Sequence, residues 1–287
     1  MNLANDGATP RGVYDWDYVL WEVRLKLLAV GFFSYLSAFF LAHCLSSWIC
    51  ASYRTLSAKQ KVFWNMDITR ALFAVQGCGA GLWALLIDPV FQADQVYSQQ
   101  KWIWFHCLIA AGFFLLENVV AFSSNILFGV FNVFAVIHPL FAFGGLLGLM
   151  TNIKSGHYLP LMGLLLEMNA PSFCACRILL RIGYAKNLLW KTNQWVMVHI
   201  LHCRMVLVYH MWWVYISSWN NVVENLGLPY FCVFFMGLST LTLIFNPYWI
   251  YKSTQWLVRA VDWKIPNTSV KNASSEKSNS ETVKKKI

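Results

Sequence analysis

The segment NVFAVIHPLFAFGG, residues 132–145, lies at the centre of the apolar stretch that decides the class of this protein. No Lys, Arg, Asp or Glu occurs between Asn118 and Thr151, and His138 stands directly before Pro139. An uncharged run of this length is long enough to cross roughly 30 Å of hydrocarbon as a helix. The stretch therefore predicts a membrane helix that carries a titratable group and a helix-breaking residue near its middle.

The composition of the whole chain favours the same class. Of 287 residues, 58% are hydrophobic and only 12% are charged, whereas roughly a quarter of an average soluble domain is charged. We therefore expect an all-α polytopic membrane protein. The net charge of +9 comes largely from the residues after 250, so no nucleic-acid partner is expected. The eight cysteines lie in or beside apolar runs and are interpreted as packing thiols.

Seven segments are apolar enough to be transmembrane helices. Their approximate limits are 27–50, 71–91, 102–122, 126–150, 157–180, 195–218 and 228–250. With seven crossings, every Lys- and Arg-rich connection falls on the cytosolic side, which predicts a lumenal N-terminus and a cytosolic C-terminus. The chain then divides into a lumenal segment 1–26, a first helix with its basic cytosolic connection 27–61, a block of six helices 62–262 and a disordered cytosolic tail 263–287.

The tail ends in KKKI, with Lys284 and Lys285 four and three places from the C-terminus. This spacing is typical of the dilysine signal that retrograde coat proteins read. It predicts residence in the endoplasmic reticulum membrane with cycling to the ER–Golgi intermediate compartment. A basic end can also be a simple solvated charge run. The two glycosylation sequons at Asn267 and Asn272 are expected to be unmodified, because they lie in this cytosolic tail.

Ionisable side chains at membrane depth are functional candidates by default, because lipid does not solvate them. His106 and Glu117 are about three helical turns apart and share a face. Glu167 and Asn169 lie in the segment EMNAP, where a proline follows closely. These residues are candidates for substrate binding or catalysis.

The block WVMVHILHCRMVLVYHMWW, residues 195–213, concentrates further polar groups on one helix. His199, Cys203 and His210 share a face and Arg204 points to nearly the opposite side, which predicts a helix at the centre of the bundle. Arg204 needs a carboxylate or several carbonyls. His199, His202, Cys203 and His210 also suggest a metal cluster, but no face presents a metal-binding pair, so hydrogen-bonded imidazoles and no metal are expected.

His138 allows two interpretations. In the first, it only satisfies the carbonyl of Ala135 that Pro139 leaves without its amide partner. In the second, a neutral imidazole in a cavity acts as a base or a nucleophile.

Several segments together resemble the TLC-domain family, named for TRAM, LAG and ceroid-lipofuscinosis proteins. They are VFWNMDITRALFAVQ (62–76), GLWALLIDPV (81–90), VIHPLFAF (136–143), LLLEMNAP (164–171), HCRMVLVYHMWW (202–213) and NPYW (246–249). The resemblance covers nearly the whole chain. It implies a TLC-type helix bundle over residues 62–262 and a role in the lipid metabolism of the endoplasmic reticulum.

The ceramide synthases of that family carry a His-His pair on one helix and a His-Asp pair on the next. His138 matches the first histidine, but Pro139 stands in the second position. Leu166 and Glu167 stand where His-Asp is expected. The resemblance thus implies that His138 accepts the acyl group and that Glu167, or else His199 or His202, is its base. The missing second histidine argues against ceramide synthesis.

Three functions follow from the resemblance and the residues. One is an acyltransferase that uses acyl-CoA and a glycerophospholipid or glycerophosphodiester acceptor of the phosphatidylglycerol or bis(monoacylglycero)phosphate type, with Arg204 on the phosphate. Another is an ER-to-Golgi cargo receptor for newly made lysosomal enzymes. A third is a non-catalytic lipid sensor. The expected partners are membrane lipids, the retrieval coat machinery, lysosomal enzymes for a receptor, and a second copy of the chain in a homodimer.

Overall fold

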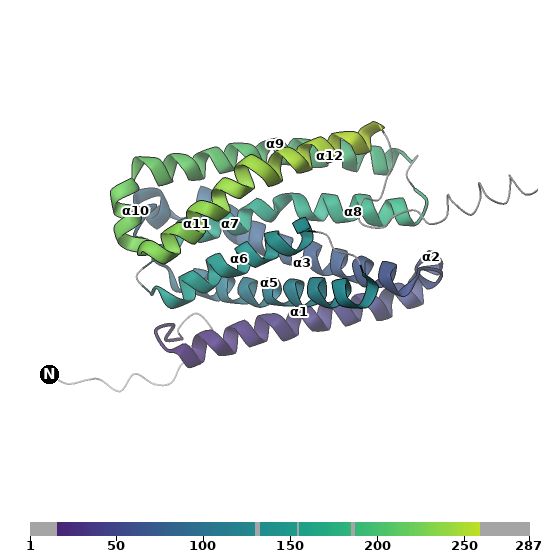
Figure 1. Ribbon diagram of the computed structural model, residues 1–287, viewed down its shortest axis with the longest axis horizontal. Coiled ribbons are helices and arrows are strands. Elements are labelled where there is room, and N and C mark those ends of the chain that lie inside the picture. The colour runs from purple at the N-terminus through teal and green to yellow at the C-terminus, as the bar shows by residue number, and fades with distance from the viewer. Residues whose placement is uncertain (1–15, 130–132, 154, 185–186, 259–287) are drawn as a thin grey trace, which may run out of the picture.

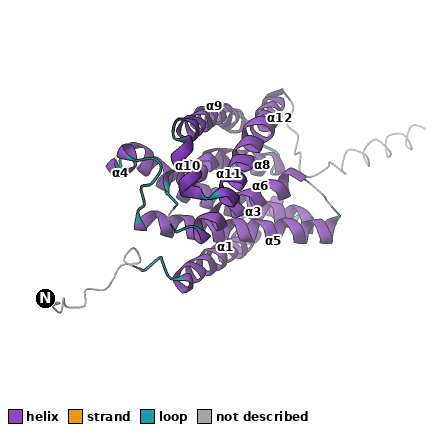
Figure 2. Ribbon diagram, turned by 60° about the vertical axis from the view of Figure 1, so that its left-hand side comes forward, coloured by secondary structure: helices purple, strands orange, loops and turns teal. Residues whose placement is uncertain are grey.

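The computed structural model describes residues 16–129, 133–153, 155–184 and 187–258. Within these ranges the secondary structure is entirely helical, as Figure 2 shows. The predictions for the first 15 residues and for the tail at 263–287, with Lys284 and Lys285, lie outside the described residues.

The helices follow one another with short connections. They are α1 (Trp21–Ile49), α2 (Ala51–Arg54), α3 (Ala58–Leu86), α4 (Pro89–Ala93), α5 (Lys101–Phe128), α6 (Val133–Thr151), α7 (Tyr158–Leu165), η2 (Leu166–Asn169), α8 (Ala170–Arg181), α9 (Leu188–Ser217), α10 (Trp219–Leu226), α11 (Leu228–Thr240), η3 (Leu241–Phe245) and α12 (Asn246–Val258). The 3₁₀ turn η2 joins α7 to α8, and the π-helical turn η3 joins α11 to α12.

The long helices run roughly along one axis of the molecule. In Figure 1, α1 and α5 form one side, α9 and α12 form the opposite side, and α3, α6, α7 and α8 lie between them. The packed pairs include α1 with α5, α5 with α6, α3 with α8, and α9 with α12. This arrangement places α6, η2 and α9 around a common interior.

Five of the helical stretches are long and apolar enough to cross a membrane. They are Trp21–Ile49, Ala58–Leu86, Lys101–Phe128, Tyr158–Arg181 and Leu228–Gln255. The expectation of an all-α polytopic membrane protein is therefore confirmed. In α6 the apolar part, Val136–Thr151, is shorter, and α9, which is 30 residues long, is not among the five because its polar residues lower its hydropathy.

The helices extend beyond the predicted apolar limits. α3 begins at Ala58 instead of 71, because Ser57 and Gln60 form a capping box at its start. α5 continues through Phe128 and ends at Gly129, which has φ 59°, so α6 begins at Val133 instead of 126. Hydropathy marks where lipid contact begins, whereas capping residues decide where a helix begins and ends.

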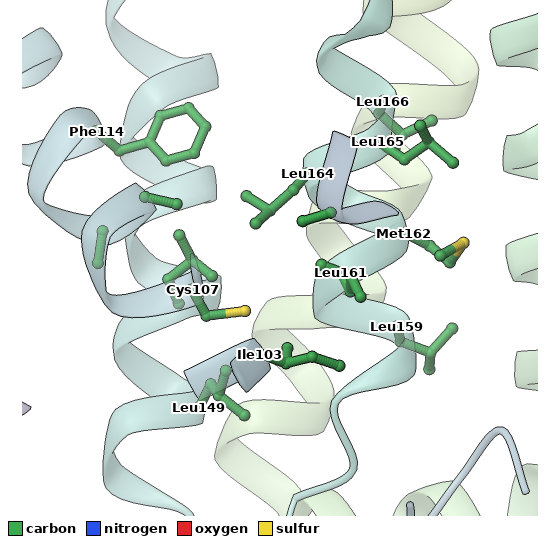
Figure 3. Close-up of a cluster of buried hydrophobic side chains, with 14 of the residues drawn as sticks. Ile103, Cys107, Phe114, Leu149, Leu159, Leu161, Met162, Leu164, Leu165 and Leu166 are labelled. Atoms are coloured by element: carbon green, nitrogen blue, oxygen red, sulfur yellow. The ribbon is translucent and has the colours of Figure 1, made fainter. Parts of the chain in front are cut away.

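Close packing holds α1, α3, α5 and α7 together. Gly112 of α5 faces α1 so closely that a Cβ atom there would lie 2.4 Å from the backbone nitrogen of Phe32. Small residues allow such backbone approach between membrane helices. Figure 3 shows part of the buried apolar cluster, in which Ile103 and Cys107 of α5 lie beside Leu161 and Leu164 of α7.

Ion pairs within the bundle fix other helices. Asp67 of α3 pairs with Arg177 and, at 3.1 Å, with Arg181 of α8. Glu117 of α5 pairs with Arg70 of α3. Buried pairs of this kind fix the register of neighbouring helices.

Candidate functional site

The proline after His138 does not end α6. Helix α6 runs through Pro139, whose carbonyl accepts a hydrogen bond from Asn118 Nδ2 of α5 at 3.1 Å. Asn118 also donates to the carbonyl of Phe114 at 2.8 Å, so it clamps α5 against the weakened turn of α6. This clamp holds the backbone beside His138 in a defined position.

The chain changes its helical geometry just where Glu167 lies. Residues Leu166–Asn169 form a 3₁₀ turn, and Pro171 stands in the first turn of α8. Proline has no amide hydrogen to donate, which favours a local break in the α-helical pattern. The turn brings the buried carboxylate of Glu167 to His138, with 3.4 Å between Oε1 and the imidazole Nε2.

Aromatic rings surround the imidazole of His138. The rings of Phe114, Phe245 and Trp249 meet it edge to face, with centroid distances of 6.5, 5.7 and 5.3 Å. Phe245 and Trp249 stack on each other at 5.3 Å. The frame holds the imidazole against Glu167 and limits the access of water.

Arg204 brings a positive charge to the same interior. It is 4% exposed, and its guanidinium lies over the ring of Trp249 at 4.6 Å. Its Nε and Nη2 have no hydrogen-bond partner among the described residues, and no carboxylate of these residues lies within 4.0 Å of it. Because Glu117 is bound to Arg70, it does not serve Arg204. The guanidinium is therefore poised to hold an anionic group.

His138, Glu167 and Arg204 line one pocket with about 140 Å³ of accessible volume. Its other walls are apolar and come from α5, α6, α7, α9, α11 and η3. A volume of this size suits the reacting end of a lipid better than a whole lipid. A Cβ atom added at Gly145 or Gly163, which also line the pocket, would meet no atom within 4 Å.

The three histidines of α9 do not line this pocket. His199 and His202 are exposed and hydrogen bond to carbonyls of their own helix, of Trp195 at 2.8 Å and Val198 at 2.7 Å. His210 contacts the hydroxyl of Tyr158 at 2.7 Å. The expectation of a central α9 was wrong, because these local bonds allow the histidine face to lie on the outside of the bundle.

Two further candidate residues lie outside the lining of this pocket. Asn169 is buried beside Glu167 in η2 but does not line the pocket. His106 lies on α5 next to Gln76, at 3.3 Å, in a separate groove. Within the described ranges, no group of three His, Cys, Asp or Glu side chains is placed to hold a metal ion.

Sequence reasoning missed two residues that shape the site. Trp249 carries both the cation–π contact and a ring contact to His138, and the segment NPYW that contains it was used only as a family motif. Arg70 was not singled out either, but it pairs with Glu117 inside the bundle. No spacing in the sequence pointed to either residue, because each meets its partners on other helices.

Comparison with known proteins gives close relatives. Protein CLN8 of Homo sapiens is 50% identical over 272 residues, which is 95% of both chains. Protein CLN8 of Canis lupus familiaris and of Mus musculus are each 47% identical over 286 residues, covering 100% of this chain and 99% of theirs. No family model matches the chain, and no solved structure matches it. Since these relatives align with it from end to end, the chain belongs to the CLN8 family.

Proposed function

We propose that this protein is an acyltransferase of the endoplasmic reticulum membrane. It moves an acyl group from coenzyme A to a glycerophospholipid or glycerophosphodiester acceptor of the phosphatidylglycerol or bis(monoacylglycero)phosphate type. The observation that carries the proposal is the contact of His138 Nε2 with Glu167 Oε1 at 3.4 Å in a pocket that also holds the buried Arg204.

The pair suits acyl transfer by either of two routes. In the first, one ring nitrogen of His138 attacks the thioester carbon, the C–S bond breaks, and Glu167 takes the proton from the other nitrogen. The acceptor hydroxyl then attacks the acyl carbon, the bond between that carbon and His138 breaks, and the hydroxyl proton passes to the imidazole. In the second, His138 takes the hydroxyl proton and Glu167 holds the imidazolium while the hydroxyl attacks the thioester directly. The leaving thiolate takes up a proton from Glu167 in the first route and from the imidazolium of His138 in the second, so coenzyme A is released as a thiol.

Arg204 supports an acceptor that carries a phosphate. A buried guanidinium with unmet donors is a strong partner for a phosphate oxygen, because charge-assisted bonds strengthen where water is scarce. The apolar walls suit the lipid portion next to the reacting atoms. Acyl-CoA is the donor in this proposal, and no metal is required.

The proposal includes the seven-helix topology. Helices α6 and α9 run alongside the five apolar spans in Figure 1, which supports counting them as the two additional crossings. The basic connections then fall on the cytosolic side, the N-terminus is lumenal and the C-terminus is cytosolic. The lysines of the KKKI end, Lys284 and Lys285, bind the retrieval coat machinery, and the protein cycles to the ER–Golgi intermediate compartment.

Two alternatives use the same features differently. A cargo receptor for lysosomal enzymes would use the dilysine end for cycling, but the connections assigned to the lumen, 92–101, 151–156 and 219–227, offer little surface. A lipid sensor would keep the pocket of His138, Glu167 and Arg204 without turnover.

The decisive experiment looks for the acyl group itself. Purified protein in detergent is incubated with acyl-CoA and a panel of lysophospholipids and glycerophosphodiesters, and both the product and the mass of the protein are measured. Turnover that requires His138 supports the proposal, and an acyl adduct on a peptide containing His138 selects the first route. Absence of turnover in a monodisperse sample with all acceptors, together with equal rescue of null cells by wild type and His138→Ala, would sink the enzyme proposal.

A further inference from the structure

A second site lies on the outer surface of α3 and α5, separate from the pocket of His138. It is a groove of about 450 Å³, and its lining residues are Val75, Gln76, Gly79, Ala80, Trp83, Trp102 and His106. Val75 is 65% exposed and Trp83 is 53% exposed, so the groove opens on the outside of the bundle. In a membrane protein that surface faces lipid.

A chain of hydrogen bonds leads from the interior to this groove. Tyr35 of α1 donates its hydroxyl proton to Gln76 Oε1. The amide nitrogen of Gln76 is then the group that faces His106 Nδ1, at 3.3 Å. Because an amide nitrogen only donates, Nδ1 accepts, and the neutral imidazole carries its proton on Nε2. The chain thus fixes His106 as a donor.

The donor on His106 is open to a partner from outside the described part of the chain. Among the described residues, no hydrogen-bond partner faces Nε2, and the imidazole is partly exposed. An imidazole at membrane depth that offers a donor toward lipid is a functional candidate by default. Its complement is an acceptor oxygen on a membrane component.

The shape and charge of the groove restrict that component. Gly79 and Ala80 are the smallest residues that line the groove. A Cβ atom added at Gly79 would meet no atom within 4 Å. The indoles of Trp83 and Trp102 also line the groove, and none of its lining residues is Lys, Arg, Asp or Glu. Trp102 lies next to Lys101, the first residue of α5, at the level where indoles mark the membrane interface.

We propose that this groove binds a membrane sterol. The sterol hydroxyl oxygen accepts the hydrogen bond from His106 Nε2, and the ring system extends from there along Gly79 and Val75 of α3. A neutral ligand fits the absence of charged lining side chains, and a rigid ring system fits the open space beside Gly79. Flexible lipids with a hydroxyl, such as diacylglycerol, offer the same acceptor but not the same shape. The proposal does not depend on the acyltransferase activity.

The test uses the full-length protein in phosphatidylcholine nanodiscs with a photoreactive cholesterol analogue. Labelled peptides are mapped by mass spectrometry, and unlabelled cholesterol and diacylglycerol are the competitors. We expect labels on peptides of Val75–Trp83 or Trp102–His106, competition by cholesterol only, and labelling reduced at least about fivefold in Gly79→Leu. The leucine fills open space and favours helix over glycine, so the variant is expected to fold. His106→Phe should weaken binding about two- to tenfold, the usual effect of one lost hydrogen bond.

A matched variant separates the two sites. Gly163→Leu fills the pocket of His138 in the same way, because Gly163 also faces open space there. It should leave the cholesterol label unchanged, whereas Gly79→Leu should leave any acyl transfer unchanged. Equal labelling of Gly79→Leu and wild type would overturn the sterol proposal. Equal competition by diacylglycerol would also overturn it, in favour of a flexible lipid, and a label confined to the His138 pocket would assign the sterol there instead.

Discussion

The pocket of His138 and the groove of His106 each place an imidazole at membrane depth, but its partner differs. His138 faces the carboxylate of Glu167 at 3.4 Å inside the bundle, beside the buried charge of Arg204. His106 faces the amide of Gln76 at 3.3 Å on the lipid-facing surface, with no charged neighbour in its groove.

The partner determines what each imidazole can do. A carboxylate accepts a proton and stabilises an imidazolium, so the pair of His138 and Glu167 can move protons during a reaction. An amide neither takes up nor releases a proton near neutral pH, so the pair of His106 and Gln76 can only orient a donor. Two histidines in one bundle therefore differ in kind, since one faces a group that can exchange a proton and the other faces a group that cannot.

The strongest test of this comparison removes the two imidazoles in turn. His138→Ala should lower acyl transfer by about 10²- to 10⁴-fold, because it removes the base or nucleophile. His106→Ala should change the same activity by less than about twofold, because His106 lies outside the pocket. Initial rates with acyl-CoA and the best acceptor are the measurement.

Folding must be monitored in parallel, since the ring of His138 packs against Phe245 and Trp249. A monodisperse peak in size-exclusion chromatography and an unchanged melting temperature show that the bundle is intact. If the two variants lose activity equally, the division between the sites is wrong.

A smaller effect on acyl transfer is expected when His138 is given the same kind of partner as His106. Glu167→Gln gives His138 the same amide partner that His106 has, while keeping the size of the side chain. We expect a loss of about tenfold to hundredfold in kcat, as for other groups that orient a catalytic histidine. Steady-state kinetics of the variant are compared with those of Glu117→Gln, a carboxylate outside the pocket. If Glu167→Gln keeps the kcat of the wild type, Glu167 is not the catalytic partner of His138.

Much of the fold follows from the sequence, because a chain segment in lipid must satisfy its own backbone hydrogen bonds and therefore forms a helix. The uncharged run around Pro139 has to be helical in a bilayer, and the structure confirms an all-α membrane protein. The limits of the helices were less accurate, since they depend on caps such as Ser57 and Gly129. A capping residue is a local feature that an average over hydropathy does not detect.

The composition of the site followed from the sequence only in part. His138, Glu167 and Arg204 were all candidates, but whether they share one cavity depends on how three helices pack. Helical spacing relates residues on one helix and says nothing about two. Consequently the partner of Glu117, and the outward orientation of His199, were visible only in the folded bundle.

The buried charge of Arg204 gives the third prediction, because only the His138 site has such a charge. Arg204→Met keeps much of the side-chain length and removes a guanidinium with unmet donors. We expect kcat/KM for a phosphate-bearing acceptor to fall about tenfold or more, from the loss of a charge-assisted hydrogen bond. Stability should be unchanged or higher, since a buried charge is replaced by an apolar group.

The control for Arg204→Met is an uncharged acceptor with the same hydroxyl, such as a monoacylglycerol. Its transfer should be affected less than that of the phosphate-bearing acceptor. An equal loss with both acceptors would mean that Arg204 shapes the pocket without holding a phosphate.

A third imidazole, His157, extends the comparison to a histidine directly before the apolar span Tyr158–Arg181, which in the structure begins one residue later than predicted. It is fully buried before α7. The backbone N–H of Gln100 donates to its Nδ1 at 3.0 Å, and its Nε2 has no partner among the described residues. Burial lowers the pKa of His157 to about 4, and the carbonyl oxygen of Gln100, which lies 3.1 Å from Nδ1, offsets part of that effect. No carboxylate of the described residues is paired with it, so no nearby negative charge supports a protonated ring.

The sign of the pH effect follows from that lowered pKa. Between about pH 4 and pH 6.5 the unfolded chain binds a proton at His157 and the folded chain does not, so stability falls as the pH falls. From pH 7 to pH 5 we expect a loss of about 1–2 kcal/mol from this group, seen as a lower melting temperature in detergent. His157→Gln keeps an acceptor for the amide of Gln100 but does not titrate, so it should lose less stability than wild type over the same range. Identical pH profiles for the two proteins would mean that His157 becomes protonated in the folded state without loss of stability. Its burial would then not distinguish it from the histidines that face lipid or substrate.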